Sequence, residues 1–74
     1  MEKRKYRVTI TVGGESFTIL GDTEPERVQK LAALYDERLR QTERAYPSLS
    51  PARTSILAGL NLTEEYLRLQ EDYQ

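Results

Sequence analysis

Two adjacent glycines, Gly13 and Gly14, separate two short segments in which apolar and polar residues alternate. The first segment spans residues 6–12 and the second spans residues 15–20. Such alternation is typical of half-buried strands, and a glycine pair supplies the positive φ angles that a two-residue hairpin turn requires. The pattern therefore predicts an antiparallel β-hairpin over residues 6–20. Because two strands alone are barely stable in water, another element must cover its apolar face.

A first helix is predicted over residues 23–46. Thr23 and Glu26 have the spacing of a capping box, with Thr23 as the N-cap residue. Pro47 disfavours helical geometry in the residue before it and so ends the helix. Residues at i, i+3, i+4 and i+7 spacing form one stripe that we expect to cover the hairpin: Val28, Leu31, Ala32, Tyr35, Leu39 and Thr42.

A second helix is predicted over residues 50–74, with Ser50 as its N-cap and Pro51 in the first helical position. It carries two apolar stripes. The first comprises Ile56, Leu60, Thr63 and Leu67, and the second comprises Leu62, Tyr66, Leu69 and Tyr73. An amphipathic helix of a monomer normally has a single apolar face.

We therefore expect one stripe to close the chain's own fold and the other to pack against a second copy, because a four-three-four spacing suits coiled-coil packing. The pattern still runs at Gln74, which we interpret as the beginning of a longer helix. Parallel and antiparallel pairing both remain open. The predicted dimer-interface residues are Ile56, Leu60, Leu62, Tyr66, Leu69 and Tyr73.

The predicted fold class is therefore α+β: a two-stranded antiparallel hairpin, then two helices, the second of which begins a coiled-coil-like dimerisation helix. We treat residues 1–74 as a single domain. The net charge of −1 combines +3 on residues 1–7 with −4 on the remainder. We interpret residues 1–5 as a flexible basic arm, with contact to nucleic acid or to an acidic protein surface as the alternative.

Neither cysteine nor histidine occurs in the 74 residues. This excludes disulfides, thiolate or imidazole metal sites, and the usual pairs of nucleophile and base. No apolar run approaches the ~18 residues of a membrane span, and the first residues lack the continuous apolar run that a secretory signal needs. We expect a cytoplasmic, non-enzymatic protein without a cofactor, a metal, a small-molecule substrate or a membrane segment. Since so short a chain is marginally stable alone, oligomerisation is the expected remedy.

One surface feature of the first predicted helix lies off its apolar stripe. Leu34 is flanked on the same side by Arg27 and Arg38, with Lys30 nearby. Single exposed leucines are ordinary. An apolar residue surrounded by basic ones is also typical of a docking patch for an acidic partner. We therefore include Leu34 among the candidate partner-binding residues.

Three segments together resemble the ZapA family of bacterial cell-division proteins. Residues 8–19, VTITVGGESFTI, resemble the N-terminal hairpin of that family. Gly21-Asp22 followed by Pro25-Glu26 resembles the start of its first helix. Residues 56–66, ILAGLNLTEEY, resemble a stretch typical of its second helix, with glycine at position 59 where alanine is common.

The resemblance implies a ZapA-like head domain that binds FtsZ, the tubulin-like GTPase, and cross-links its filaments at the mid-cell division site. ZapA proteins have no catalytic activity, and their long C-terminal helix forms dimers and, when extended, antiparallel tetramers. Family analogy places the FtsZ contact at charged residues near the hairpin turn and at the end of the first helix. In this chain these residues are Glu15, Arg38, Arg40, Glu43 and Arg44.

Two alternatives to this function remain. The first is a small nucleic-acid-binding dimer that uses Lys3, Arg4, Lys5 and Arg7. The acidic remainder of the chain argues against it, because nucleic-acid binders usually place basic residues along a whole face. The second is a purely structural oligomerisation module, which would have no partner other than itself.

Overall fold

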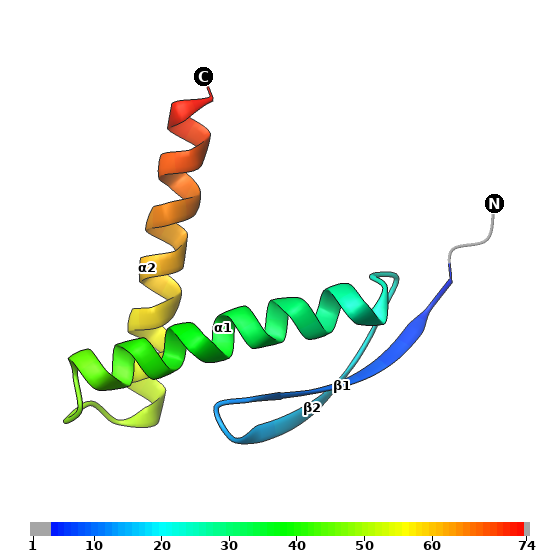
Figure 1. The fold of residues 1–74 in the computed structure, drawn as a ribbon, viewed down its shortest axis with the longest axis horizontal. Coiled ribbons are helices and arrows are strands. Elements are labelled where there is room, and N and C mark those ends of the chain that lie inside the picture. The colour runs from blue at the N-terminus through cyan, green and yellow to red at the C-terminus, as the bar shows by residue number, and fades with distance from the viewer. Residues whose placement is uncertain (1–3, 74) are drawn as a thin grey trace. The chain divides into compact units, whose positions relative to one another are not determined.

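The computed structural model describes residues 4–73 and confirms the α+β class. The elements follow one another as strand β1 (Tyr6–Val12), strand β2 (Glu15–Gly21), helix α1 (Pro25–Ala45) and helix α2 (Pro51–Asp72) (Figure 1). The chain forms two compact units, one ending at Glu37 and the other beginning at Arg38. Helix α1 therefore contributes to both units.

The hairpin forms as the alternation and the glycine pair predict. β1 and β2 pair antiparallel, with Val8 opposite Ile19 and Thr9 opposite Thr18. Gly13 and Gly14 both have positive φ angles, of 59° and 80°, as a two-residue turn between twisted strands requires. Across the exposed face, the hydroxyl oxygens of Thr9 and Thr18 lie 3.3 Å apart. The opposite, apolar face is the one available for packing.

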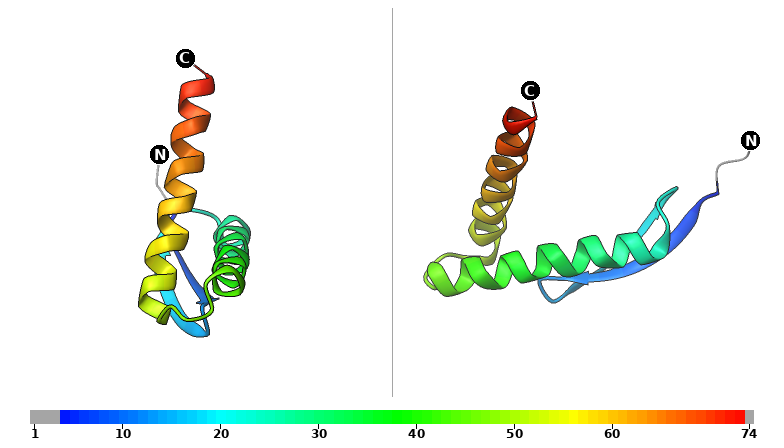
Figure 2. Two further views of the ribbon diagram at one scale, coloured as in Figure 1. Left: turned by 90° about the vertical axis from the view of Figure 1, so that its left-hand side faces the viewer. Right: turned by 45° about the horizontal axis from the view of Figure 1, so that its top comes forward.

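The first part of α1 lies along the hairpin, as Figures 1 and 2 show. Val8 of β1 is buried together with Val28 and Ala32 of α1. Leu31 is an exception to the predicted stripe, because 52% of its surface is exposed. The prediction that Leu31 is a core residue is therefore wrong for the single chain. Its position lies at the edge of the covered face rather than at its centre.

Helix α1 begins at Pro25, so the prediction of Thr23 as its N-cap is wrong. The carbonyl of Glu24 accepts the first helical hydrogen bond, from the N–H of Val28 at 3.1 Å, and Glu24 therefore occupies the N-cap position. The physical reason is Pro25, which disfavours helical geometry in the residue before it. A cap at Thr23 would make Glu24 the first helical residue, and the proline that follows Glu24 disfavours this.

The start of α2 agrees with prediction. Ser50 has extended backbone angles, and its hydroxyl accepts a hydrogen bond from the N–H of Arg53 at 3.2 Å. Pro51 is the first residue of the helix. The second unit buries Leu39 and Thr42 of α1 with Thr54 and Ala58 of α2. The buried residues of α2 belong to neither of the two named apolar stripes, of which only Leu62 is partly buried. That one of these stripes closes the chain's own fold stays a prediction.

Candidate functional site

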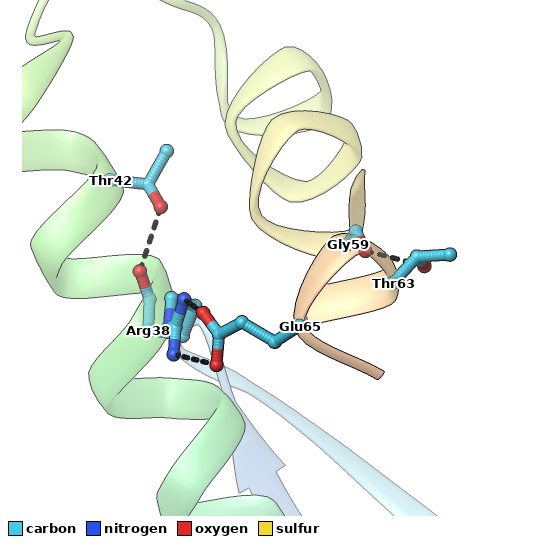
Figure 3. A network of polar contacts seen from close by, with 5 residues as sticks. All are labelled: Arg38, Thr42, Gly59, Thr63 and Glu65. Atoms are coloured by element: carbon cyan, nitrogen blue, oxygen red, sulfur yellow. Dashed lines mark hydrogen bonds and ion pairs between the residues drawn. The ribbon is translucent and has the colours of Figure 1, made fainter. Parts of the chain in front are cut away.

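An ion pair joins α1 to α2 in the second unit. Both terminal nitrogens of Arg38 donate hydrogen bonds to the carboxylate of Glu65 (Figure 3). One of these bonds has a donor–acceptor distance of 3.0 Å. This two-point arrangement matches the planar guanidinium to the carboxylate. The hydrogen bond from Arg38 lowers the pKa of Glu65, and the same bond raises the pKa of Arg38. Arg38, whose side chain is 26% exposed, is therefore engaged within its own chain.

Threonine residues let the two helices of this unit pack without unsatisfied hydroxyls. Thr42 donates to the carbonyl of Arg38 at 2.8 Å (Figure 3), and Thr54 donates to that of Ser50 at 3.0 Å. Each hydroxyl is thus satisfied inside its own helix. Thr54 and Ala58 define the inner side of α2, which also carries Glu65.

The predicted dimer-interface residues lie on other sides of α2. Leu62 is partly buried. Ile56, Leu60, Tyr66, Leu69 and Tyr73 are exposed, Ile56 by 63% and Tyr73 by 87%. At about 100° per residue, Ile56, Leu60 and Leu67 lie opposite the inner side, and Tyr66, Leu69 and Tyr73 lie next to it. We call the first set the outer stripe and the second the lateral stripe. Two separate apolar faces therefore remain uncovered.

The predicted partner-binding residues of α1 do not form one surface. Leu34 and Arg38 lie four positions apart on one side of the helix, and Leu34 is 62% exposed. Arg40 and Arg44 are also four positions apart and exposed. They lie roughly 120° around the axis of α1 from Leu34 and Arg38. Glu43 lies exposed next to the buried face of α1. The charged run that looks continuous in the sequence is therefore divided around the helix.

The remaining predicted contacts lie at the N-terminal side of the chain. Glu15 is exposed at the start of β2, directly after the hairpin turn. Arg4 and Lys5 of the basic arm are exposed as well, as is Arg7 of β1. Lys3 lies outside the described residues.

A groove lies between the hairpin and α1 in the first unit. Its volume is about 340 Å³. Val8 and Ile19 contribute from the strands, and Val28, Leu31 and Tyr35 contribute from the helix. We call this the hairpin groove. Because its lining is apolar and carries no cluster of charged groups, it suits another apolar side chain rather than an ion.

Sequence reasoning missed the two polar side chains that fasten α1 to the hairpin. The amide of Gln29 donates to the carbonyl of Thr9 at 2.8 Å, and the carboxylate of Asp36 accepts from the N–H of Gly13 at 2.9 Å. Gln29 and Asp36 are seven residues apart and so lie on the same side of α1, next to its apolar stripe. Polar residues seven positions apart beside an apolar stripe are the sequence signal from which these two contacts could have been predicted.

Residues 4–73 contain no group of three or more acidic, cysteine or histidine side chains placed to hold a metal ion. Within the same residues, no helix has the length and apolar character needed to cross a membrane. The features that stand out are the hairpin groove and the two exposed stripes of α2. The geometry thus defines a small α+β protein with uncovered apolar faces on a hairpin-and-helix head and on the helix that follows it.

Comparison with known proteins gives a consistent family. Residues 8–74 match the family described as cell division protein ZapA. The ZapA protein of Geobacillus sp. (strain WCH70) is 28% identical over 72 residues, covering 97% of this chain and 83% of that protein. The ZapA protein of Bacillus anthracis is 25% identical over 71 residues, covering 96% and 80%.

A solved structure, described as a ZapA mutant dimer from Geobacillus stearothermophilus, is similar in fold. Its TM-score is 0.79 at 30% sequence identity, and the match covers 99% of this chain and 85% of the other. The chain belongs to the ZapA family of cell division proteins. Its role is accordingly an accessory role in cell division.

Proposed function

We propose that this chain binds FtsZ filaments in the cytoplasm, at the mid-cell division site, and cross-links them as a dimer without catalysing a reaction. The observation that carries the proposal is the family match over residues 8–74. Two exposed apolar stripes on α2 support self-association, and a similar protein has been solved as a dimer.

The proposed mechanism is bivalent binding. Each head contributes a weak, charge-assisted contact through Glu15, Leu34, Arg38, Arg40, Glu43 and Arg44. A dimer then holds two heads together, so that binding of one head raises the effective concentration of the other near the filament. Cross-linking follows without any new chemistry, and its loss should accompany the loss of the dimer.

The division of the charged residues around α1 refines this proposal. Glu65 engages Arg38 in an ion pair within the chain. Arg40 and Arg44 lie on a different side of α1, in its last two turns. We propose that Arg38 chiefly positions α2, and that the charged contact with FtsZ also includes the side of α1 that carries Arg40 and Arg44.

The test is co-sedimentation with GTP-assembled FtsZ filaments, alongside the mass of the chain by sedimentation equilibrium. We expect the chain to pellet with filaments as a dimer. Arg40→Glu with Arg44→Glu should reduce pelleting at least tenfold at low salt, since rim charges act through electrostatic attraction. Arg4→Glu with Arg7→Glu makes the same change in net charge and is the matched control.

Each outcome separates the candidate functions. Equal loss in both double variants would mean that net charge alone governs binding. A properly folded dimer that never pellets would contradict the FtsZ proposal. Binding to an oligonucleotide, with an affinity that falls steeply with salt and is lost in the Arg4/Arg7 variant, would instead favour the nucleic-acid alternative.

A further inference from the structure

The two edges of the hairpin differ in what covers them. Within residues 4–73 the sheet consists of β1 and β2, so each strand has one side without a neighbouring strand. Helix α1 covers the β1 side, where Gln29 donates to the carbonyl of Thr9. Just beyond this strand, Asp36 accepts from the N–H of Gly13. On β2, by contrast, all residues from 15 to 20 are exposed. We call the free side of β2 the open edge.

The register of the hairpin shows which main-chain groups point out from the open edge. Val12 and Glu15 lie opposite each other and close the two-residue turn as a hydrogen-bonded pair. Pairs alternate along an antiparallel ladder, so Ser16, Thr18 and Leu20 direct their N–H and C=O groups away from β1. Among residues 4–73, no hydrogen bond from another element reaches the main chain of these three residues.

The open edge also lacks the features by which proteins usually protect an exposed strand. Lysine, proline and β-bulges serve this purpose. The segment ESFTILG contains neither lysine nor proline, and its register runs without a bulge. Phe17 and Ile19 on the apolar face are 50% and 41% exposed. An added strand therefore meets unused main-chain groups together with alternating apolar and hydroxyl side chains.

The charges at the two ends of the open edge specify the kind of strand that fits. Glu15 is the first residue of β2, Asp22 directly follows its last residue, and both are exposed. No charged residue lies between them in the sequence. Arg7 belongs to β1, one strand further away. If the β2 strands of two copies paired antiparallel, the Glu15 end of each would meet the Asp22 end of the other, which like charges disfavour. A strand with basic ends is favoured instead.

We propose that the open edge of β2 binds an extended segment of a partner protein, which adds to the sheet as a third strand. This segment carries apolar residues at alternate positions and basic residues at its ends. Main-chain hydrogen bonds provide its affinity, and contacts with Phe17 and Ile19 provide its selectivity. The inference goes beyond the proposed FtsZ contact, with which the open edge shares only Glu15, and it holds whichever protein supplies the segment.

Hydrogen exchange with a synthetic peptide tests this inference on the wild-type chain. The peptide KTVTVTK, acetylated and amidated at its ends, reads the same in both directions and so suits either strand orientation. By NMR, we expect saturating peptide to slow exchange of the amides of Ser16, Thr18 and Leu20 at least about tenfold, since hydrogen bonding protects an amide. The amides of Thr9 and Thr11, on the covered β1 side, are the internal control and should not change.

Matched changes to the peptide and to the chain separate charge from main-chain bonding. The peptide ETVTVTE differs only at its ends and should bind at least about tenfold more weakly at low salt. Thr18→Pro removes an outward N–H without removing a bond between β1 and β2, which edge strands tolerate, and should abolish binding. Thr18→Val keeps that N–H and is the matched control. Circular dichroism compares the fold of the two variants with wild type.

The outcomes separate this inference from its rivals. Slowed exchange confined to the outward amides of β2 supports it. Binding without this protection, or no binding at millimolar peptide, overturns it. Outward amides that are already protected in the free chain, and that lose protection on dilution, would show that the open edge pairs with a second copy, which also overturns it. Equal affinity for the two peptides overturns the assignment of basic ends. Pelleting with FtsZ is measured separately, so failure here leaves the proposed function intact.

Discussion

At the scale of single residues, Arg38 illustrates how a charged side chain that seems suited to a partner can serve the fold. Family analogy places it among the residues expected to contact FtsZ. In the structure it makes a two-point hydrogen bond to Glu65, which lies 27 residues further along the chain. Local charge patterning cannot reveal this partner, because the contact depends on how α1 and α2 meet.

The first prediction concerns the pH dependence of this ion pair. The pKa of Glu65 is lowered in the folded chain, so its contribution to stability is present above the usual glutamate pKa and is lost as pH falls through the lowered value. Arg38 remains protonated throughout this range. Glu65→Gln should therefore lower the melting temperature at pH 7, and the difference from wild type should disappear in acid.

Thermal unfolding followed by circular dichroism, at a fixed chain concentration, provides the measurement. Glu71→Gln removes the same charge from an exposed position of α2 and is the control. Because the pair is partly exposed, 1 M salt should reduce the effect of Glu65→Gln. A destabilisation that persists unchanged at low pH would mean that packing, rather than the ion pair, is what Glu65 provides.

At the scale of elements, the two helix starts show which capping signals are decisive. Ser50 caps α2 as predicted. Its extended backbone lets its hydroxyl accept a hydrogen bond from the first turn, and the proline that follows it suits the first helical position. At α1 the threonine signal failed, because it stood two residues before Pro25 instead of one. Proline's restriction on its predecessor therefore outweighs a favourable capping side chain at the wrong distance.

The second prediction follows from this cap. Ser50→Ala removes the acceptor for the N–H of Arg53 and should reduce the free energy of unfolding by about 1 kcal/mol. Ser48→Ala, in the same connection but exposed and outside the cap, should change it by less than about 0.5 kcal/mol. Urea unfolding of both variants at equal chain concentration makes the comparison. Equal effects would show that the Ser50 hydroxyl does not cap the helix.

At the scale of the whole molecule, the distribution of apolar surface is the main feature. Buried apolar residues are few and small or branched, chiefly Val8, Val28, Ala32, Leu39 and Ala58. Many larger ones on β2 and α2 are exposed. A core of this size contributes only modest stability by itself. Self-association would therefore stabilise the fold as well as supply the second head.

The third prediction tests the lateral stripe. Leu69 is 57% exposed in the single chain, so Leu69→Glu should leave the monomer folded. Placing a charge in an apolar interface should raise the dimer dissociation constant at least about tenfold. Sedimentation equilibrium over a range of concentrations measures this, with Leu34→Glu as the matched control. If Leu69→Glu has the mass of wild type at every concentration, the lateral stripe is not part of the dimer interface.

Several local features follow from the sequence because each depends on local physics. The φ range of glycine sets the hairpin turn, and the period of apolar residues sets the strands and the two helices. The Ser50 cap depends on a hydroxyl near a free N–H. The same periodicity places the apolar residues of α2 on two stripes. Tertiary structure decided which sides of the helices meet. Small residues, Thr54 and Ala58, form the inner side of α2 in place of the long apolar ones.

Tertiary structure also joined residues that no local pattern connects. The N–H of Gly13 donates to Asp36, 23 residues away, and Arg38 pairs with Glu65. It divided the basic run of α1 between two sides of the helix and left the β2 half of the hairpin open. These features depend on the positions of elements that are distant in the chain. Their packing is set by side-chain size and hydrogen bonding at the contact, which periodicity alone does not specify.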